Sequence, residues 1–159
     1  MTKKIKIKKT LVEQILDKAK ISYEGLVLNA LDQPDELPDG LILSDIYKTL
    51  ALIGDKTGPV IGIIPLTEHL SEKKLASASG NKKVSMIPQK DLQKITGYVH
   101  GANNPIGIHF NKHFPIFFDN IAKDQNFILV SAGELGRSIK INPEILAKFV
   151  NANFTDLLQ

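Results

Sequence analysis

The alternation of apolar and polar positions predicts a helix near the start of the chain. Thr10 followed three residues later by Glu13 is typical of a capping box, in which each side chain accepts a hydrogen bond from the other residue's backbone N–H. Apolar residues then recur at helical spacing, which predicts an amphipathic helix over residues 10–19. The next segments are expected to be extended, looped and briefly helical in turn: residues 21–28, 32–40 and 41–46.

The rest of the chain alternates between strand and helix signals. Two apolar, β-branched runs at residues 47–53 and 59–66 are separated by the glycine-flanked residues 54–58, which predicts a β-hairpin. Shorter apolar runs predict three more strands: residues 115–119, 127–132 and 138–141. Capping and stop signals predict three helices: residues 71–80, 88–95 and 142–150. Residues 97–113 show no clean period, which predicts a long functional loop. Together these elements predict an α+β fold with at least six strands.

Composition is ordinary for a soluble, packed domain. The chain has 159 residues, of which 43% are hydrophobic and 23% charged, and this balance argues against disorder. Its longest apolar stretch, residues 60–66, is far shorter than the roughly 18 residues that a membrane span needs. No apolar signal core follows the basic N-terminus. We therefore expect a single domain over residues 1–159, without internal repeats, in the cytoplasm and without membrane contact.

The charge distribution weakly favours a polyanionic partner. The formal net charge is +3, and lysines concentrate at positions 3, 4, 6, 8 and 9 and again at 73, 74, 82 and 83. These lysines are either solvated surface or a phosphate-binding surface, and only the second would give salt-dependent binding. With no cysteine, the chain has no disulfide, no thiolate metal site and no catalytic thiol of its own.

A metal site is not expected either. His109 and His113 lie four residues apart, as zinc ligands on a helix can. The adjacent residues Phe114 and Pro115 disfavour a helix at this point, and no carboxylate with suitable spacing is near. We expect neither a metal nor any other cofactor.

Lys48 is the unusual residue, because it opens a strand that is otherwise apolar. Desolvating an ammonium group is costly. Its stem can therefore lie along the sheet edge with the amine in water, or its charge can be held in a cleft. Residues 101–105 supply a counterpart, since Gly101 can adopt angles closed to other residues and Pro105 fixes the end of the turn. Such a turn can direct several N–H groups at one anion or oxyanion, although many such turns are only structural. His100 lies close enough in sequence to join this site.

Six segments of the chain occur in the same order and at similar spacing in the YbaK/EbsC family: residues 46–50, 79–86, 96–107, 114–119, 130–136 and 151–157. The chain resembles this family over nearly its whole length beyond the first helix. The family is itself similar to the editing domain inserted in bacterial prolyl-tRNA synthetases. The resemblance implies a mixed, largely antiparallel β-sheet of about six or seven strands with flanking helices.

The resemblance also implies a function. A member of this family is a trans-editing deacylase that removes mischarged cysteine from tRNA(Pro), with tRNA(Cys) as a further substrate. In the route proposed for the family, the thiol of the substrate cysteine attacks the ester and leaves as a thiolactone. The implied partners are aminoacyl-tRNA and the prolyl-tRNA synthetase that hands the substrate over. The sequence leaves the oligomeric state open.

Residue by residue, the resemblance assigns the catalytic positions to Lys48 and Gly101. Lys48 would orient the ester or the terminal phosphate and ribose, while N–H groups of the Gly101 turn would hold the carbonyl oxygen. The substrate-binding positions are Ala102, Asn103, Asn104, Pro105, Ser131, Gly133, Ser138 and Leu28. Two of them depart from the family pattern: Ser138 stands where an aspartate is expected, and Leu28 where a tyrosine is expected. Both would border the pocket and affect substrate choice.

Three alternatives remain open at this point. Water, rather than the substrate thiol, can attack the ester. The substrate can be Ala-tRNA(Pro), because a pocket separates side chains that differ by one small group by only about 1–3 kcal/mol. The chain can also be a non-catalytic tRNA- or protein-binding module that kept the fold.

Overall fold

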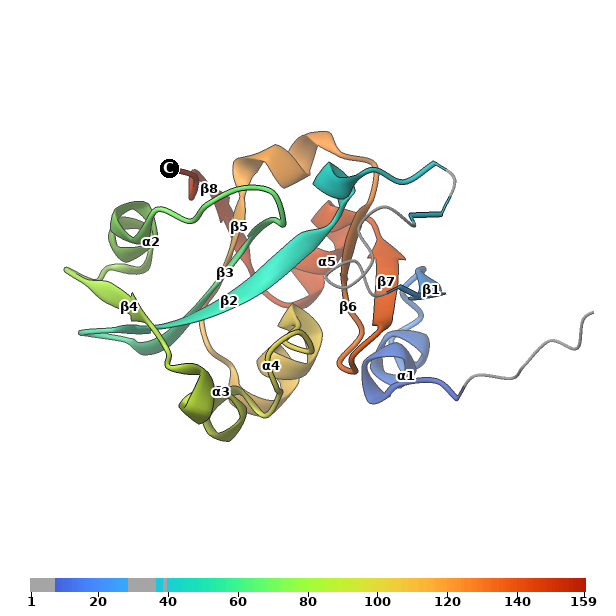
Figure 1. The fold of residues 1–159 in the computed structure, drawn as a ribbon, viewed down its shortest axis with the longest axis horizontal. Coiled ribbons are helices and arrows are strands. Elements are labelled where there is room, and N and C mark those ends of the chain that lie inside the picture. Colours follow the sequence, from blue (N-terminus) through green and yellow to red (C-terminus); the bar gives the residue numbers. More distant parts are fainter. Residues whose placement is uncertain (1–7, 29–36, 39) are drawn as a thin grey trace, which may run out of the picture.

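The computed structural model describes residues 8–28, 37–38 and 40–159, and these residues form two β-sheets with helices packed around them (Figure 1). The helices are α1 (Leu11–Lys18), α2 (Glu72–Ser79), α3 (Gln89–Thr96), α4 (Pro105–Lys112) and α5 (Pro143–Phe149), with single 3₁₀ turns at Leu43–Asp45 and Asn120–Asp124. The strands are β1 (Glu24–Val27), β2 (Tyr47–Gly54), β3 (Gly58–Pro65), β4 (Val84–Met86), β5 (Ile116–Asp119), β6 (Ile128–Ser131), β7 (Arg137–Ile141) and β8 (Asn153–Thr155). The loop predicted at residues 32–40 lies largely outside the described residues.

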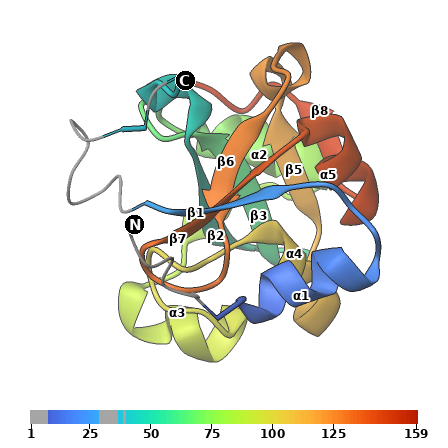
Figure 2. The ribbon, with the colours of Figure 1, turned by 90° about the vertical axis from the view of Figure 1, so that its right-hand side faces the viewer.

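The larger sheet has the strand order β4-β2-β3-β5-β8, and the smaller one β1-β7-β6. All pairs are antiparallel except β3 with β5 and β5 with β8. A parallel bridge between Ile46 and Leu129 brings the start of β2 against β6. Figure 2 shows the smaller sheet lying in front of the larger one, with α1 beneath it. The predicted α+β class with a mixed, largely antiparallel arrangement is confirmed, although the described residues hold eight strands in two sheets.

The first helix follows from its predicted cap. The Thr10 hydroxyl accepts from Glu13 N at 3.1 Å, and the Glu13 carboxylate accepts from Thr10 N at 2.9 Å. The same carboxylate accepts from Arg137 Nη2 at 2.8 Å, which ties α1 to β7. Val12 and Leu16 are completely buried on the inner face of this helix. The amphipathic helix predicted from sequence is therefore confirmed.

Two apolar clusters pack against the two faces of the larger sheet. Side chains of β2 contribute alternately to one cluster and to the other, because successive side chains of a strand point to opposite faces. Tyr47 and Ala51 belong to the cluster that includes the strands of the smaller sheet. Leu52 belongs to the cluster under α2, against which Leu50 also packs. Both faces of β2 are therefore covered by apolar residues.

The long loop predicted at residues 97–113 is wrong in its second half. Residues from Pro105 onward form α4, whose N-cap Asn104 accepts from Gly107 N at 2.6 Å. An Asn-Pro pair is a normal helix start, because Pro lacks an N–H that would have no partner in the first turn. The expectation that Phe114 and Pro115 disfavour a helix at the two histidines is also wrong, since His109 lies in α4 and His113 is its C-cap. Pro115 restricts only the residue before it, where the helix has already ended.

Among the helices described, none has the length and apolar character that a membrane crossing would require.

Candidate active site

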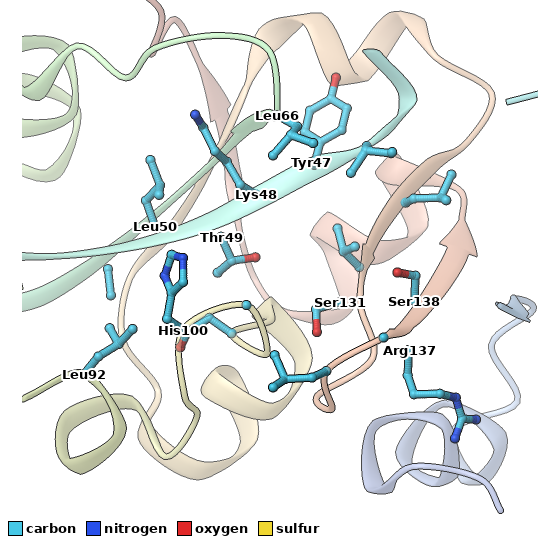
Figure 3. Close-up of a pocket in the computed structure, with 18 of the residues that line it drawn as sticks. Tyr47, Lys48, Thr49, Leu50, Leu66, Leu92, His100, Ser131, Arg137 and Ser138 are labelled. Carbon is cyan, nitrogen blue, oxygen red and sulfur yellow. The ribbon is translucent and has the colours of Figure 1, made fainter. Parts of the chain in front are cut away.

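A cavity of about 360 Å³ opens between the two sheets, where the first half of β2 passes the turn before α4 (Figure 3). Its walls are mostly apolar, with a few polar groups, which is the usual make-up of a small-molecule site. Six of the ten catalytic and substrate-binding positions assigned from sequence line it: Leu28, Lys48, Gly101, Asn103, Ser131 and Ser138. The cavity therefore brings together segments that are far apart in the chain.

Lys48 lies at the edge of this cavity rather than across it from the turn. The strand alternation puts Lys48 on the same face of β2 as Leu50. In Figure 3 its amine and the Thr49 hydroxyl extend to opposite sides of the strand. β4 pairs with Leu52, Ile53 and Gly54, and Ile87 N donates to Ala51 O at 3.2 Å. The edge of β2 is therefore open over residues 47–50, and the cavity reaches around that edge.

The Lys48 ammonium is half-buried, and its environment has two opposing effects. Burial lowers the pKa of this amine below its ordinary value, while the carboxylate of Glu68 acts to raise it. Among the described residues, no carboxylate lies within salt-bridge distance of Lys48. The ammonium is therefore partly desolvated and, as far as the described residues go, has no carboxylate bound to it.

Two side-chain oxygens in the cavity walls are buried without a hydrogen-bond partner among the described residues: Thr49 Oγ1 and Asn103 Oδ1. Thr49 points down from β2 toward the side where Ser131 and the turn before α4 lie (Figure 3). A buried polar group without a partner costs about 1–3 kcal/mol. Two such groups in one cavity mark positions at which a ligand can supply the missing partner.

The turn over residues 101–105 divides into a lining part and a supporting part. Gly101, at φ 90°, and Asn103 line the cavity. Ala102, Asn104 and Pro105 are buried and do not line it. The Asn104 amide donates to Ala102 O at 3.1 Å while its oxygen caps α4, so both of its polar groups are used within the protein. These three residues fix the turn from behind.

The wall formed by the smaller sheet carries two serines. Ser131 and Ser138 are register partners on β6 and β7. The Ser131 hydroxyl accepts from Gly133 N at 3.1 Å, which holds the following turn. Gly133 itself does not line the cavity. Its φ is 91°, and a Cβ there would lie 2.9 Å from Val12 Cγ2, so this glycine packs the turn closely against α1.

The two positions that depart from the family pattern both border the cavity. Leu28 is buried there, and its N–H donates to Gly136 O at 2.8 Å. Ser138 lies on β7, the strand that pairs with β1 just before Leu28. Among the described residues that line the cavity, none is an aspartate, glutamate or cysteine. In the described part of the chain, no three His, Asp or Glu side chains gather in a way that could hold a metal ion.

Sequence reasoning missed several lining residues, of which Thr49 carries the clearest chemistry. The sequence contains a signal for Thr49, because a second polar residue beside Lys48 in an otherwise apolar strand also suggests a functional role. His100, noted from its place in the sequence, lines the cavity and points toward β2 (Figure 3). Arg137 contributes only its near end, because its guanidinium turns away to Glu13 and to Lys8 O, 2.9 Å from Nη1.

Comparison with known proteins gives the family. The aminoacyl-tRNA editing domain family matches residues 40–149. The chain is 43% identical over 118 residues to EbsC of Enterococcus faecalis, which is described as a candidate Cys-tRNA(Pro)/Cys-tRNA(Cys) deacylase; the match covers 74% of this chain and 71% of that protein.

Solved structures share the fold at low sequence identity. A hypothetical protein superposes with a TM-score of 0.81 at 18% identity, covering 93% of this chain and 99% of the other. A candidate trans-editing enzyme for prolyl-tRNA synthetase gives a TM-score of 0.76 at 17% identity, covering 93% and 94%. The resemblance to the YbaK/EbsC group is confirmed, and the chain belongs to the family of aminoacyl-tRNA editing domains.

Proposed function

We propose that this protein is a trans-editing deacylase that removes cysteine from mischarged tRNA(Pro). Membership of an aminoacyl-tRNA editing family supports the reaction class, and the description of its Enterococcus faecalis relative supports cysteine as the amino acid. The observation that carries the proposal is the cavity at the open edge of β2. It offers a partly desolvated ammonium on one side and, on the other, two side-chain oxygens that no described residue binds.

The two faces of β2 suggest how the substrate lies. Lys48 binds the last phosphate of the tRNA, because its ammonium extends to the side of the strand away from the turn. The aminoacyl ester passes over the strand edge into the part of the cavity bounded by Thr49 and Asn103. There the oxygens of these two side chains accept from the substrate's N–H and O–H donors. The N–H groups of the Gly101 turn are available for the ester carbonyl.

The ester bond is already activated, so that positioning supplies much of the required acceleration. In the proposed step, the cysteine thiol sulfur attacks the ester carbonyl carbon. A C–S bond forms, the C–O bond to the ribose breaks, and the thiol proton ends on the ribose hydroxyl, giving free tRNA and a β-thiolactone. The step needs no nucleophile from the protein. This fits a cavity whose described lining residues include no cysteine or carboxylate.

Deacylation of Cys-, Ala- and Pro-tRNA(Pro) tests the proposal. We expect Cys-tRNA(Pro) to be cleaved fastest, and cleavage to stop when the thiol of the charged cysteine is alkylated. Cleavage of Ala-tRNA(Pro) in preference to the cysteine ester would replace thiol attack by hydrolysis. Binding of all three without cleavage would make the chain a non-catalytic module.

Lys48→Ala is expected to abolish turnover with the fold intact. Lys94→Ala is a matched control, because Lys94 is an exposed lysine of α3 outside the cavity. Full activity of Lys48→Ala would remove Lys48 from the mechanism. We also propose that prolyl-tRNA synthetase supplies the choice of tRNA, and repeating the assay with Cys-tRNA(Cys), with and without that synthetase, tests this part separately.

A further inference from the structure

A second charged feature lies at the opposite end of β2 from the cavity. The turn between β2 and β3 and the turn before β4 carry three exposed lysines, which we call the lysine ridge: Lys56, Lys82 and Lys83. None of the three has a carboxylate within 4.0 Å of its amine among the described residues. The two turns lie together at the tip of the larger sheet (Figure 1).

The backbone beneath the ridge is fastened by two side chains. Asn81, which is 7% exposed, accepts with Oδ1 from Lys56 N at 2.8 Å and from Thr57 N at 3.0 Å. Asp55 Oδ1 accepts from Lys82 N at 2.9 Å and from Lys83 N at 3.1 Å. Each turn thus supplies a side chain that binds the backbone of the other. The three lysines are presented from a rigid base rather than from loose loops.

Charge at the ridge remains positive after its acidic neighbour is counted. The backbone N–H groups of Lys83 and Lys82 lower the pKa of the Asp55 carboxyl below its ordinary value, with a smaller effect from the charge of Lys56. Asp55 is therefore ionised at neutral pH and offsets one of the three lysine charges. A surplus of two positive charges is left at this tip.

The ridge stands at a definite distance from the cavity. β2 runs six residues from Lys48 to Gly54, which opposes Gly58 at the turn, and strand rise makes this about 20 Å. The edge strand β4 spans part of the same distance, since Val84 pairs with Gly54 and Met86 lines the cavity. One nucleic-acid strand advances by about 3.4 Å per stacked nucleotide. Phosphates roughly six nucleotides from a 3′ end held in the cavity would therefore reach the ridge.

We propose that the lysine ridge binds the phosphate backbone of the tRNA acceptor stem while the acylated 3′ end occupies the cavity. This inference rests on the proposed function. Six nucleotides reach beyond the single-stranded CCA end into the first base pairs of the stem. Lysine–phosphate contacts position a nucleic acid without reading its bases. The ridge therefore supplies affinity and register, and leaves the choice of amino acid to the cavity.

The test compares K56Q/K82Q/K83Q with K18Q/K112Q/K148Q, in which three exposed lysines of other elements are replaced. Turnover is measured on full-length Cys-tRNA(Pro) and on a short CCA oligonucleotide carrying the same ester, over a range of salt concentrations. On the full-length tRNA we expect the ridge variant to lose about tenfold or more in kcat/KM. The slope of log kcat/KM against log salt should flatten by about 2, since each phosphate contact contributes about 0.7–0.9. On the short ester the two variants should match the parent protein.

An unchanged salt slope, or an equal loss on the short ester, would overturn the inference. A flattened slope in the control variant instead would move the RNA surface to another face. Failure of the proposed function looks different, because the parent protein would then cleave no charged tRNA. Equilibrium binding of uncharged tRNA(Pro) to the same two variants still tests the ridge in that case, and melting temperatures verify that both variants are folded.

Discussion

Replacing Asn104 by Ala tests how the wall of the cavity is held, because the chain offers a matched control. Asn104 and Asn142 are both helix N-caps, and each is followed by a proline in the first turn. Asn104 is completely buried behind the Gly101 turn. Asn142 is half-buried at the start of α5 and does not line the cavity. The same substitution therefore removes the same cap in two different settings.

The two losses can be estimated from the hydrogen bonds. At Asn142 the side chain accepts from Ile145 N at 3.0 Å and donates to Asn126 O at 3.4 Å. Both bonds lie near the surface, so water can replace them and the cost is about 1 kcal/mol. At Asn104 the cap loss of about 1 kcal/mol is joined by the buried Ala102 carbonyl, which loses its donor at a cost of about 2 kcal/mol. In a domain of this size 1 kcal/mol shifts the melting temperature by about 2–4 °C. We therefore expect a drop of about 6–12 °C for Asn104→Ala and of about 2–4 °C for Asn142→Ala.

Thermal unfolding and the deacylation assay together check this reasoning. Because the Gly101 turn loses its support, Asn104→Ala should also lower kcat/KM about tenfold or more at temperatures where it is folded. Asn142→Ala should retain the kcat/KM of the parent protein. Equal destabilisation by the two substitutions, or normal turnover by Asn104→Ala, would refute the view that the buried amide positions the turn.

Three further predictions concern other parts of the structure. The kcat/KM of the parent protein, corrected for uncatalysed hydrolysis, should fall as pH rises through the lowered pKa of Lys48, because only the ammonium binds phosphate. Glu68→Gln should move this fall to lower pH, since the Glu68 carboxylate raises the pKa of Lys48. An unmoved pH profile would exclude this coupling between Glu68 and Lys48. Gly133→Ala should destabilise more than Gly136→Ala in urea unfolding. Both residues have positive φ and share the conformational cost of about 1–2 kcal/mol, but only at Gly133 does a Cβ meet a neighbour, at 2.9 Å; equal costs would mean that the contact relaxes freely. Arg137→Met should cost about 3–5 kcal/mol, because it leaves the buried Glu13 carboxylate without its charged partner. Lys74→Met breaks a solvent-exposed pair and should cost much less. Comparable thermal shifts in the two variants would contradict this.

Local signals predicted those elements whose cause is local. The capping box at Thr10 predicts the start of α1, and the N-cap at Ser71 with Gly80 beyond it predicts α2 within a residue at each end. The strands β4 and β8 were not predicted. Each has three residues and forms only because it pairs with a longer strand: β4 pairs with β2, for example at Met86 and Leu52, and β8 pairs with β5. No window of the sequence contains that information.

Helix α4 was missed for a different reason. Ile106 and Ile108 are both completely buried, and their alternation favours a strand as much as a helix. Gly107, between them, is buried too, with Tyr98 so close that no Cβ would fit. The helix is identified only by its Asn-Pro start. Because every residue of the first turn of α4 is buried, the periodic pattern is lost there and the cap is the remaining signal.

The candidate site divides in the same way between local and non-local causes. Lys48 is conspicuous because a charge in an apolar strand needs a reason, and that reason is visible in sequence. Its direction is not, because β2 carries apolar residues on both faces and the sequence gives no alternation from which to choose. Only the packed sheets show that Lys48 and Thr49 reach opposite sides of an open strand edge.

Because of that open edge, Lys48 and Thr49 can contact two different parts of the substrate. The last phosphate and the aminoacyl group of a charged tRNA lie on either side of the terminal ribose, and they differ in chemistry: one is an anion, the other a small ester with polar donors. Consecutive residues of a strand provide two unlike environments about 3.3 Å apart along the chain. The Lys48 side stays open enough to keep an ammonium charged. The Thr49 side is closed enough to bury a hydroxyl that has no hydrogen-bond partner in the described part of the chain. The open edge at the start of β2 is therefore the structural requirement of the proposed activity, and it exists because the short β4 pairs with β2 only from Leu52 onward.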